Sequence, residues 1–67
     1  MDYSRFYVGD TVIYQGNICA NNSVIRGGEY VVVETIPNKP RHAFIQDEHG
    51  NKKLIQMSFN YAKIKGR

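Results

Sequence analysis

No part of this chain repeats its apolar side chains with the period of an α-helix over three turns. The apolar residues instead gather in short segments rich in β-branched and aromatic side chains, which favour β-strands. Glycine, proline and asparagine separate these segments and favour turns. The expected strands are residues 11–15, 29–36, 42–47, 52–57 and 61–65. The sequence therefore predicts an all-β fold.

Closure of these strands into a barrel would surround one core and leave few exposed edges. Because side chains alternate between the two faces of a strand, the last strand is expected to place Lys63 and Lys65 on the solvent side. A register slip of one residue would reverse such an assignment. The expected core residues are Val12, Val31, Val33, Ala43, Ile45, Ile55, Met57, Ala62 and Ile64.

The chain has 67 residues, which is enough for one domain over 1–67, with an N-terminal arm at 1–7 and a short tail at 66–67. A domain of this size buries only about 60% of the surface that its unfolded chain exposes, so we expect marginal stability. Pro37 to Pro40 should end the second strand, because proline cannot donate to a ladder of hydrogen bonds.

The single cysteine, Cys19, cannot form an internal disulfide, and together with His42 and His49 it supplies too few ligands for structural zinc. We therefore expect no metal and no other cofactor. No apolar run approaches the ~20 residues that span a bilayer, and the first residues lack the features of a signal peptide. We expect a cytoplasmic protein that does not bind membranes.

Basic residues are distributed unevenly in this chain of net charge +3 and pI about 9.2. Residues 1–36 carry a net charge of −2, whereas residues 37–67 carry +5. If the cations lie on one face they would form a phosphate-binding surface, with Phe44 or Tyr61 available to stack on bases. The alternative is a solvated face that only keeps the domain soluble. The candidate anion-binding residues are Lys39, Arg41, Lys52, Lys53, Lys63, Lys65 and Arg67.

The order of elements resembles the SH3 barrel over nearly the whole chain. In that comparison, residues 16–28 are similar to its long RT loop, 37–41 to its n-Src loop and 48–51 to its distal hairpin. Residues 58–62, Ser-Phe-Asn-Tyr-Ala, resemble the Pro-Ser-Asn-Tyr-Val segment that closes the barrel, and 8–12, Val-Gly-Asp-Thr-Val, resemble the Gly-Asp-x-Val opening of KOW and other bacterial SH3-like barrels. The resemblance implies a five-stranded SH3-like barrel, and Ser58 to Asn60 predict a 3₁₀ turn before the last strand.

Two departures from the SH3 pattern bear on function. The third strand begins with His42 and Ala43, where SH3 domains that bind proline-rich peptides carry a tryptophan, and residues 15–28 contain no acidic side chain. The resemblance therefore argues against proline-rich ligands. It implies a closer likeness to small bacterial or phage SH3-like proteins, which bind varied partners.

The SH3 resemblance also implies a protein-binding groove of Tyr14, Phe59, Asn60 and Tyr61, which would lie together beside the expected 3₁₀ turn. Tyrosines at such a place offer rigid apolar area with a polar tip. The alternative is that Tyr14 or Phe59 caps a small core.

An enzyme is not expected, because a chain this short has no spare volume for a water-excluding site. Asp47 and Glu48 are adjacent in a hairpin and do not face each other across a cleft. The leading hypothesis is a non-catalytic binding module, a small bacterial or phage regulator or inhibitor that binds a protein partner. The first alternative is a nucleic-acid-binding barrel that uses the basic half. The second is a homo-oligomeric structural protein, because residues 30–33 are apolar on both faces of their strand.

Overall fold

Five antiparallel strands make up the regular structure of the chain in the computed structural model, which describes residues 1–18 and 21–67. The strands pair in the order β4-β3-β2-β1-β5, and no helix occurs within the described ranges. The all-β prediction is confirmed, whereas Cys19 lies outside the described residues. The strands are β1 (Thr11–Tyr14), β2 (Glu29–Ile36), β3 (Lys39–Gln46), β4 (Lys52–Gln56) and β5 (Tyr61–Lys65).

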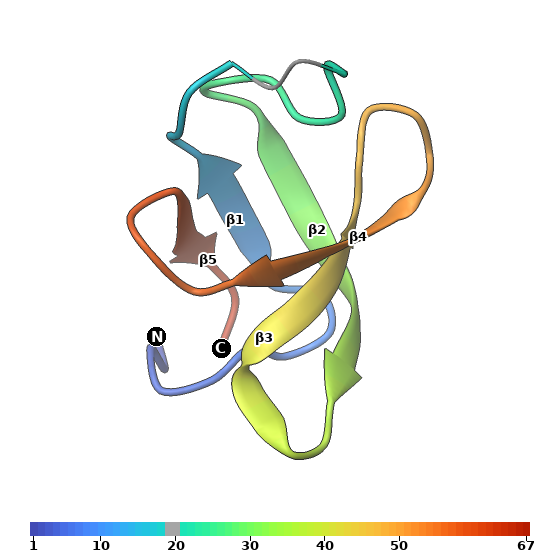
Figure 1. Cartoon of the computed structure of the whole chain (residues 1–67). Helices are drawn as coiled ribbons and strands as arrows, with labels where there is room; N and C mark the ends of the chain where they lie inside the picture. The colour runs from blue at the N-terminus through green and yellow to red at the C-terminus, as the bar shows by residue number, and fades with distance from the viewer. Residues whose placement is uncertain (19–20) are drawn as a thin grey trace.

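Strand β2 belongs to both halves of the sheet. Its first residues pair with β1, where Val31 lies opposite Thr11, and its later residues pair with β3, where Val32 lies opposite Ile45. The register shifts between Val32 and Glu34, and such a bulge bends the strand and increases its twist. In Figure 1, β3 and β4 run across the direction of β1 and β2, so the five strands form a curled half-barrel.

The concave side of this curled sheet holds the hydrophobic core. Its buried apolar residues are Phe6, Val12, Tyr14, Val24, Tyr30, Val32, Ala43, Ile45, Ile55 and Met57. The expected inward positions on the hairpin of β3 and β4 are confirmed, as is Val12 on β1. In β3 the polar His42 and Gln46 share the outward side with Phe44, and at the end of β4 the polar Gln56 lies between the buried Ile55 and Met57, which sets the phase of both strands.

The phase expected for β2 is wrong by one residue. Val32 is fully buried and Tyr30 is buried beside it, whereas Val31 and Val33 are 49% and 40% exposed. Tyr30 decides the phase, because its hydroxyl donates to Glu48 Oε2 at 2.6 Å and accepts the Ile25 N–H at 2.6 Å. A tyrosine whose polar tip finds partners can be buried at little cost, and the two valines beside it then face outward.

The phase expected for β5 is also reversed. Lys63 is buried, Ile64 is 40% exposed, and Ala62 is only partly buried and lies opposite the outward Ile13. Ala62 and Ile64 are therefore not part of the core. The cause is the pairing of Lys63 with a buried aspartate, which is described below.

Strand β3 begins earlier than its prolines suggest. The turn after β2 contains only Pro37 and Asn38, and Pro40 lies within β3. Pro40 is tolerated there because β4 pairs with β3 only from His42 onward, so no ladder N–H is required of it on that side. Lys39 and Arg41 accordingly lie in a strand, and the expected loop 37–41 is wrong.

The connection between β4 and β5 forms bends and a turn rather than the expected 3₁₀ turn. Ser58 and Tyr61 close it through reciprocal backbone hydrogen bonds of 3.4 and 3.2 Å. At the β3–β4 hairpin, Gly50 has a φ of 80°, a left-handed conformation that glycine adopts without steric cost.

The N-terminal arm crosses one end of the half-barrel. Phe6 is buried in the core, and its backbone N–H donates to the Pro40 carbonyl at 2.8 Å. The Gly9 N–H donates to the Val32 carbonyl at 2.9 Å. The two ends of the chain come close together in Figure 1.

Burial predicts unequal effects for two adjacent valines of β2. We expect Val32→Ala to lower the free energy of unfolding by about 2 kcal/mol, because it removes two buried methyl groups and leaves a cavity. Val31→Ala, on the exposed face, should cost less than about 0.5 kcal/mol. Urea unfolding followed by circular dichroism measures both, and a larger loss for Val31→Ala would contradict the observed phase of β2.

Candidate binding surface

Phe59 is the most prominent of the predicted groove residues, because its side chain is 76% exposed. The backbone beneath it is fixed to the end of β1. The Gln15 side-chain amide donates to the Phe59 carbonyl at 2.9 Å, and the Gln15 N–H donates to the Asn60 carbonyl at 2.8 Å. A rigid turn therefore holds an aromatic ring in the solvent.

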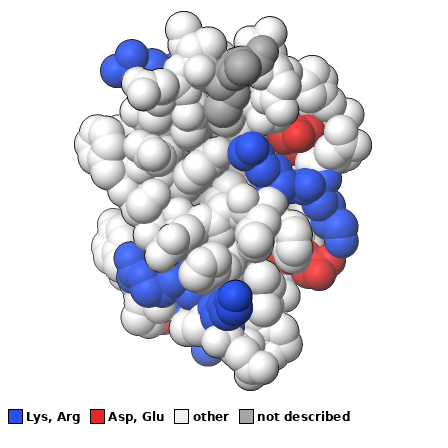
Figure 2. Space-filling view, viewed as in Figure 1, with Lys and Arg blue, Asp and Glu red and all other residues white. Residues whose placement is uncertain are grey.

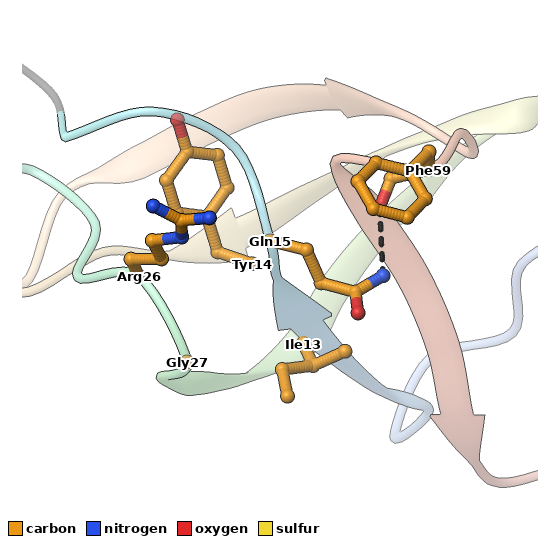
Figure 3. A pocket seen from close by; sticks show the side chains of 6 residues that line it. All are labelled: Ile13, Tyr14, Gln15, Arg26, Gly27 and Phe59. Atoms are coloured by element: carbon orange, nitrogen blue, oxygen red, sulfur yellow. Dashed lines mark hydrogen bonds between the residues drawn. The ribbon is translucent and has the colours of Figure 1, made fainter.

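A first hollow of about 250 Å³ lies on one side of Phe59 and opens to solvent. Figure 3 shows Arg26 and Phe59 at opposite sides of this hollow, with Gln15 and Ile13 between them. The Gly27 N–H donates to the Tyr14 carbonyl at 2.7 Å, which holds this part of the long loop against β1. The lining residues are Ile13, Tyr14, Gln15, Arg26, Gly27 and Phe59.

A second hollow of about 360 Å³ also has Phe59 in its lining. Its other residues come from the N-terminal arm, β3, the β4–β5 turn and β5. Phe59 is therefore a wall shared by two depressions. The lining residues are Tyr3, Arg41, Met57, Ser58, Phe59, Ala62 and Lys63.

The two tyrosines of the predicted groove have different roles from Phe59. Tyr14 is a core residue, and its hydroxyl donates to the Asn17 carbonyl. The Tyr61 ring packs against Tyr14 with centroids 5.0 Å apart and planes tilted by 42°. The structure thus brings the four predicted residues together, but Tyr14 supports the surface from within and only Phe59 and Asn60 are exposed.

The two hollows are also lined by Ile13, Arg26, Tyr3 and Arg41, which were not predicted from the sequence to belong to this surface. Ile13 offered a signal, since it directly precedes Tyr14 and must face outward if Tyr14 faces inward. No sequence signal could have placed Arg26 here, because its position depends on how the long loop returns to β1.

The predicted anion-binding residues are not gathered into one surface. Lys52 forms an ion pair with Glu34 at 2.6 Å, and its ammonium lies 5.5 Å from the centroid of the Phe44 ring. Phe44 is therefore partly covered and not presented for base stacking. In Figure 2, the basic side chains on the visible face form separate groups with uncharged surface between them. Lys39, Lys65 and Arg67 are exposed, and Lys53 is partly buried.

Lys63 is not a surface cation, which corrects its sequence assignment. Its side chain is 0% exposed and its ammonium lies 2.8 Å from Oδ2 of Asp10, whose side chain is 2% exposed. The same ammonium donates to the Asp2 and Arg5 carbonyls at 2.6 and 3.1 Å. All three N–H donors of the ammonium therefore have acceptors, as a buried charge requires.

Asp10 connects both ends of the chain to this buried charge. Its Oδ2 also accepts the Tyr7 N–H at 2.7 Å, and its Oδ1 accepts the Arg67 N–H at 3.0 Å. Gly66, with a φ of 128°, allows the close approach, because a Cβ there would lie 2.0 Å from Asp10 Oδ1. One carboxylate thus joins the N-terminal arm, β5 and the tail.

The Tyr7 ring covers this cluster of charges. Its centroid lies 5.0 Å from Lys63 Nζ, 5.3 Å from the Arg5 guanidinium carbon and 5.8 Å from that of Arg67. Cations at these distances are attracted by the electron-rich face of the ring. The Tyr7 hydroxyl donates to Asp2 Oδ2 at 2.8 Å, which fixes the ring.

These contacts shift the acidities of two carboxyl groups. Burial raises the pKa of Asp10, but hydrogen bonds from Lys63 and from the Tyr7 and Arg67 backbone outweigh burial and lower it below its usual value. Hydrogen bonds from the Ser4 side chain and backbone, and then from Tyr7, lower the pKa of Asp2 to about 2. Both carboxyl groups are thus held in the charged form.

The described residues form no group of three or more histidine, cysteine, aspartate or glutamate side chains that could hold a metal ion. His49 contacts the Asn21 carbonyl through Nε2 at 2.9 Å, and His42 lies partly buried in β3. Within the same residues, no helix is long and apolar enough to cross a membrane.

No protein-family model, curated protein or solved structure matches this chain. Functional inference therefore depends on its own geometry.

Removal of the Lys63 charge should destabilise the fold strongly. We expect Lys63→Met to cost about 3–5 kcal/mol, because it leaves the Asp10 carboxylate buried without its cation. At about 0.05–0.15 kcal/mol per residue, a domain of this size has only about 3–10 kcal/mol in total. Thermal unfolding measures the effect, with Lys65→Met at an exposed position of β5 as the matched control. Equal effects of the two substitutions would contradict the ion pair.

Acid should destabilise the fold by protonating the Asp10 and Asp2 carboxylates of the same cluster. A carboxyl whose folded pKa is depressed contributes stability above its unfolded pKa, and that contribution is lost as the pH falls through the folded pKa. We therefore expect the urea midpoint to fall between about pH 4 and pH 2. In Asp2→Asn the fall should be smaller but still present, because Asp10 remains. A midpoint independent of pH over this range would contradict the shifts.

Proposed function

We propose that this chain is a non-catalytic binding module that acts by protein–protein interaction, with Phe59 as its central anchor. The observation that carries the proposal is the 76% exposed Phe59 ring between the two hollows. A ring that is mostly in water buries little of its apolar surface within its own domain, whereas aromatic residues are enriched in interfaces. A partner side chain in either hollow would contact the ring.

Rigidity of the turn supports the same function. Binding costs conformational entropy whenever side chains and loops become ordered, so a turn ordered in advance binds more tightly. Gln15 holds the turn through its backbone and its side chain together, at 2.8 and 2.9 Å. The anchor is therefore presented in one backbone conformation.

The arrangement of the hollows supports a non-catalytic role. Ser58 and Lys63 both line the second hollow and would be the obvious nucleophile and base. However, the Lys63 ammonium directs its three N–H groups to the Asp10 carboxylate and to two backbone carbonyls, so it is not oriented toward a substrate in the hollow. Both hollows also open to solvent, which does not suit catalysis.

The proposal includes an assignment to small bacterial or phage SH3-like regulators in the cytoplasm. It is supported by the order of strands, long loop and tight hairpin, and by the position of the Phe59 turn directly before the last strand. The lone cysteine of the sequence favours a reducing compartment.

Self-association is the second candidate, because Val31, Val33 and Ile64 are 40–49% exposed. The two edges of the sheet disfavour it. Strand β5 carries the inward-pointing Lys63, and β4 begins with Lys52 and Lys53, which are features that prevent edge-to-edge pairing. Nucleic-acid binding is less favoured, since Lys63 is buried and Lys52 is paired within the molecule.

Affinity capture with quantitative mass spectrometry tests the proposal. We expect the immobilised full chain to retain a defined protein that Phe59→Ala loses, because that substitution removes the anchor without touching the core. Leu54→Ala is the matched control, since Leu54 is also exposed, at 54%, but lies on β4 away from both hollows. Capture that is unchanged by Phe59→Ala would reject this surface.

A further inference from the structure

Each hollow beside Phe59 contains an exposed arginine. Arg26 lines the first and Arg41 lines the second. Neither forms an ion pair with any carboxylate of the residues that the structure describes. The lining of the two hollows likewise includes no aspartate or glutamate.

Arg41 is held in place and still has donors to offer. Its guanidinium donates to the Tyr3 carbonyl at 2.8 Å and, more weakly, to the Met57 carbonyl at 3.5 Å. Those bonds use two of the five guanidinium N–H groups. The donors that remain can bind a carboxylate at two points, for which the planar guanidinium is well suited.

Every acidic side chain except Glu29 has a partner within the domain. Asp10 and Glu34 pair with lysines, Glu48 accepts the Tyr30 hydroxyl, and Asp47 accepts backbone N–H groups of its own hairpin. Glu29 lies opposite Ile13 in the register of β1 and β2 but lines neither hollow. The surface around Phe59 is therefore apolar at its centre and positive in both hollows.

We propose that the partner is a protein segment with acidic residues on both sides of an apolar side chain. This inference rests on the proposed function and specifies its ligand. The apolar side chain packs against Phe59, and the flanking carboxylates pair with Arg26 in one hollow and Arg41 in the other. The net charge of +3 assists the approach of such a segment.

The lining favours a protein segment over a nucleic acid. Ile13 contributes aliphatic surface to the first hollow, and Met57 and Ala62 contribute it to the second. Binding of a nucleic-acid backbone needs a succession of cations along the strand. Each hollow instead offers one exposed arginine, because Lys63 in the second is buried and neutralised.

Selection from a library of random peptides tests the inference. Peptides of about twelve residues, displayed on yeast, are selected against the immobilised full chain at low salt. We expect enrichment of sequences in which aspartate or glutamate flanks an aromatic or aliphatic residue on both sides. The most enriched peptide is then synthesised with a fluorophore and serves as the probe for affinity measurements.

Fluorescence polarisation with this peptide compares the variants. Phe59→Ala should weaken binding by about thirtyfold or more, as for a central anchor. Arg26→Gln and Arg41→Gln should each weaken it by about three- to tenfold, and Lys39→Gln, which removes an exposed cation outside both hollows, by less than about twofold. Raising NaCl from about 50 to about 300 mM should weaken the wild type more than the double arginine variant. Thermal melting of each variant shows that it is folded.

The outcomes separate this inference from the proposed function. Enriched peptides that need Phe59 but are neutral or basic would overturn the acidic partner and leave the binding module intact. Peptides that bind Phe59→Ala as well as the wild type would overturn the choice of surface. Displacement of the peptide by an oligothymidine of about fifteen nucleotides, with a steeper salt dependence, would replace the protein partner with a nucleic acid. Failure to enrich any peptide would overturn a linear acidic ligand.

Discussion

The buried pair between Asp10 and Lys63 is the interaction on which the arrangement of this small domain depends. Two charges removed from water are costly unless each is paired and hydrogen-bonded. Here the lysine has three acceptors and the aspartate also accepts backbone N–H groups from Tyr7 and Arg67. The requirement to satisfy both groups orders the N-terminal arm and orients β5. The same orientation leaves Ile64 outward and places Ala62 in the lining of the second hollow.

The five strands could be predicted from sequence, but the phase of two strands and the form of two connections could not. In the β3–β4 hairpin the polar His42, Gln46 and Gln56 occupy the outward positions, so Ala43, Ile45 and Ile55 were assigned correctly. In β2 both phases offer apolar residues, and the choice falls to Tyr30, whose hydroxyl reaches Glu48 in a distant hairpin. In β5 local alternation points the wrong way, because only the folded chain brings Asp10 to Lys63. The alternation of side chains within one strand does not show which distant residue will pair with a buried polar group.

The candidate site likewise contains residues that could be predicted from the sequence and residues that could not. Phe59 and Asn60 were predicted from the SH3 resemblance of residues 58–62, and both are exposed in the turn before the last strand. Tyr14 was predicted to line a groove, and it does line the first hollow, but it is buried in the core with the Tyr61 ring packed on it. Arg26 reaches the surface only because the long loop returns to β1, where Gly27 donates to the Tyr14 carbonyl. This hydrogen bond joins the two ends of the long loop between β1 and β2, so it forms only when the loop has folded back.

The position of the charged pair between the two ends of the chain also affects the order in which the protein folds. The β3–β4 hairpin unites residues that are near in sequence, whereas Asp10 and Lys63 must meet across most of the chain. Closing such a large loop costs entropy, so contacts of this kind form late in folding. Interactions absent from the transition state mainly slow unfolding. We therefore expect the contacts between the two ends of the chain to slow unfolding more than they speed folding.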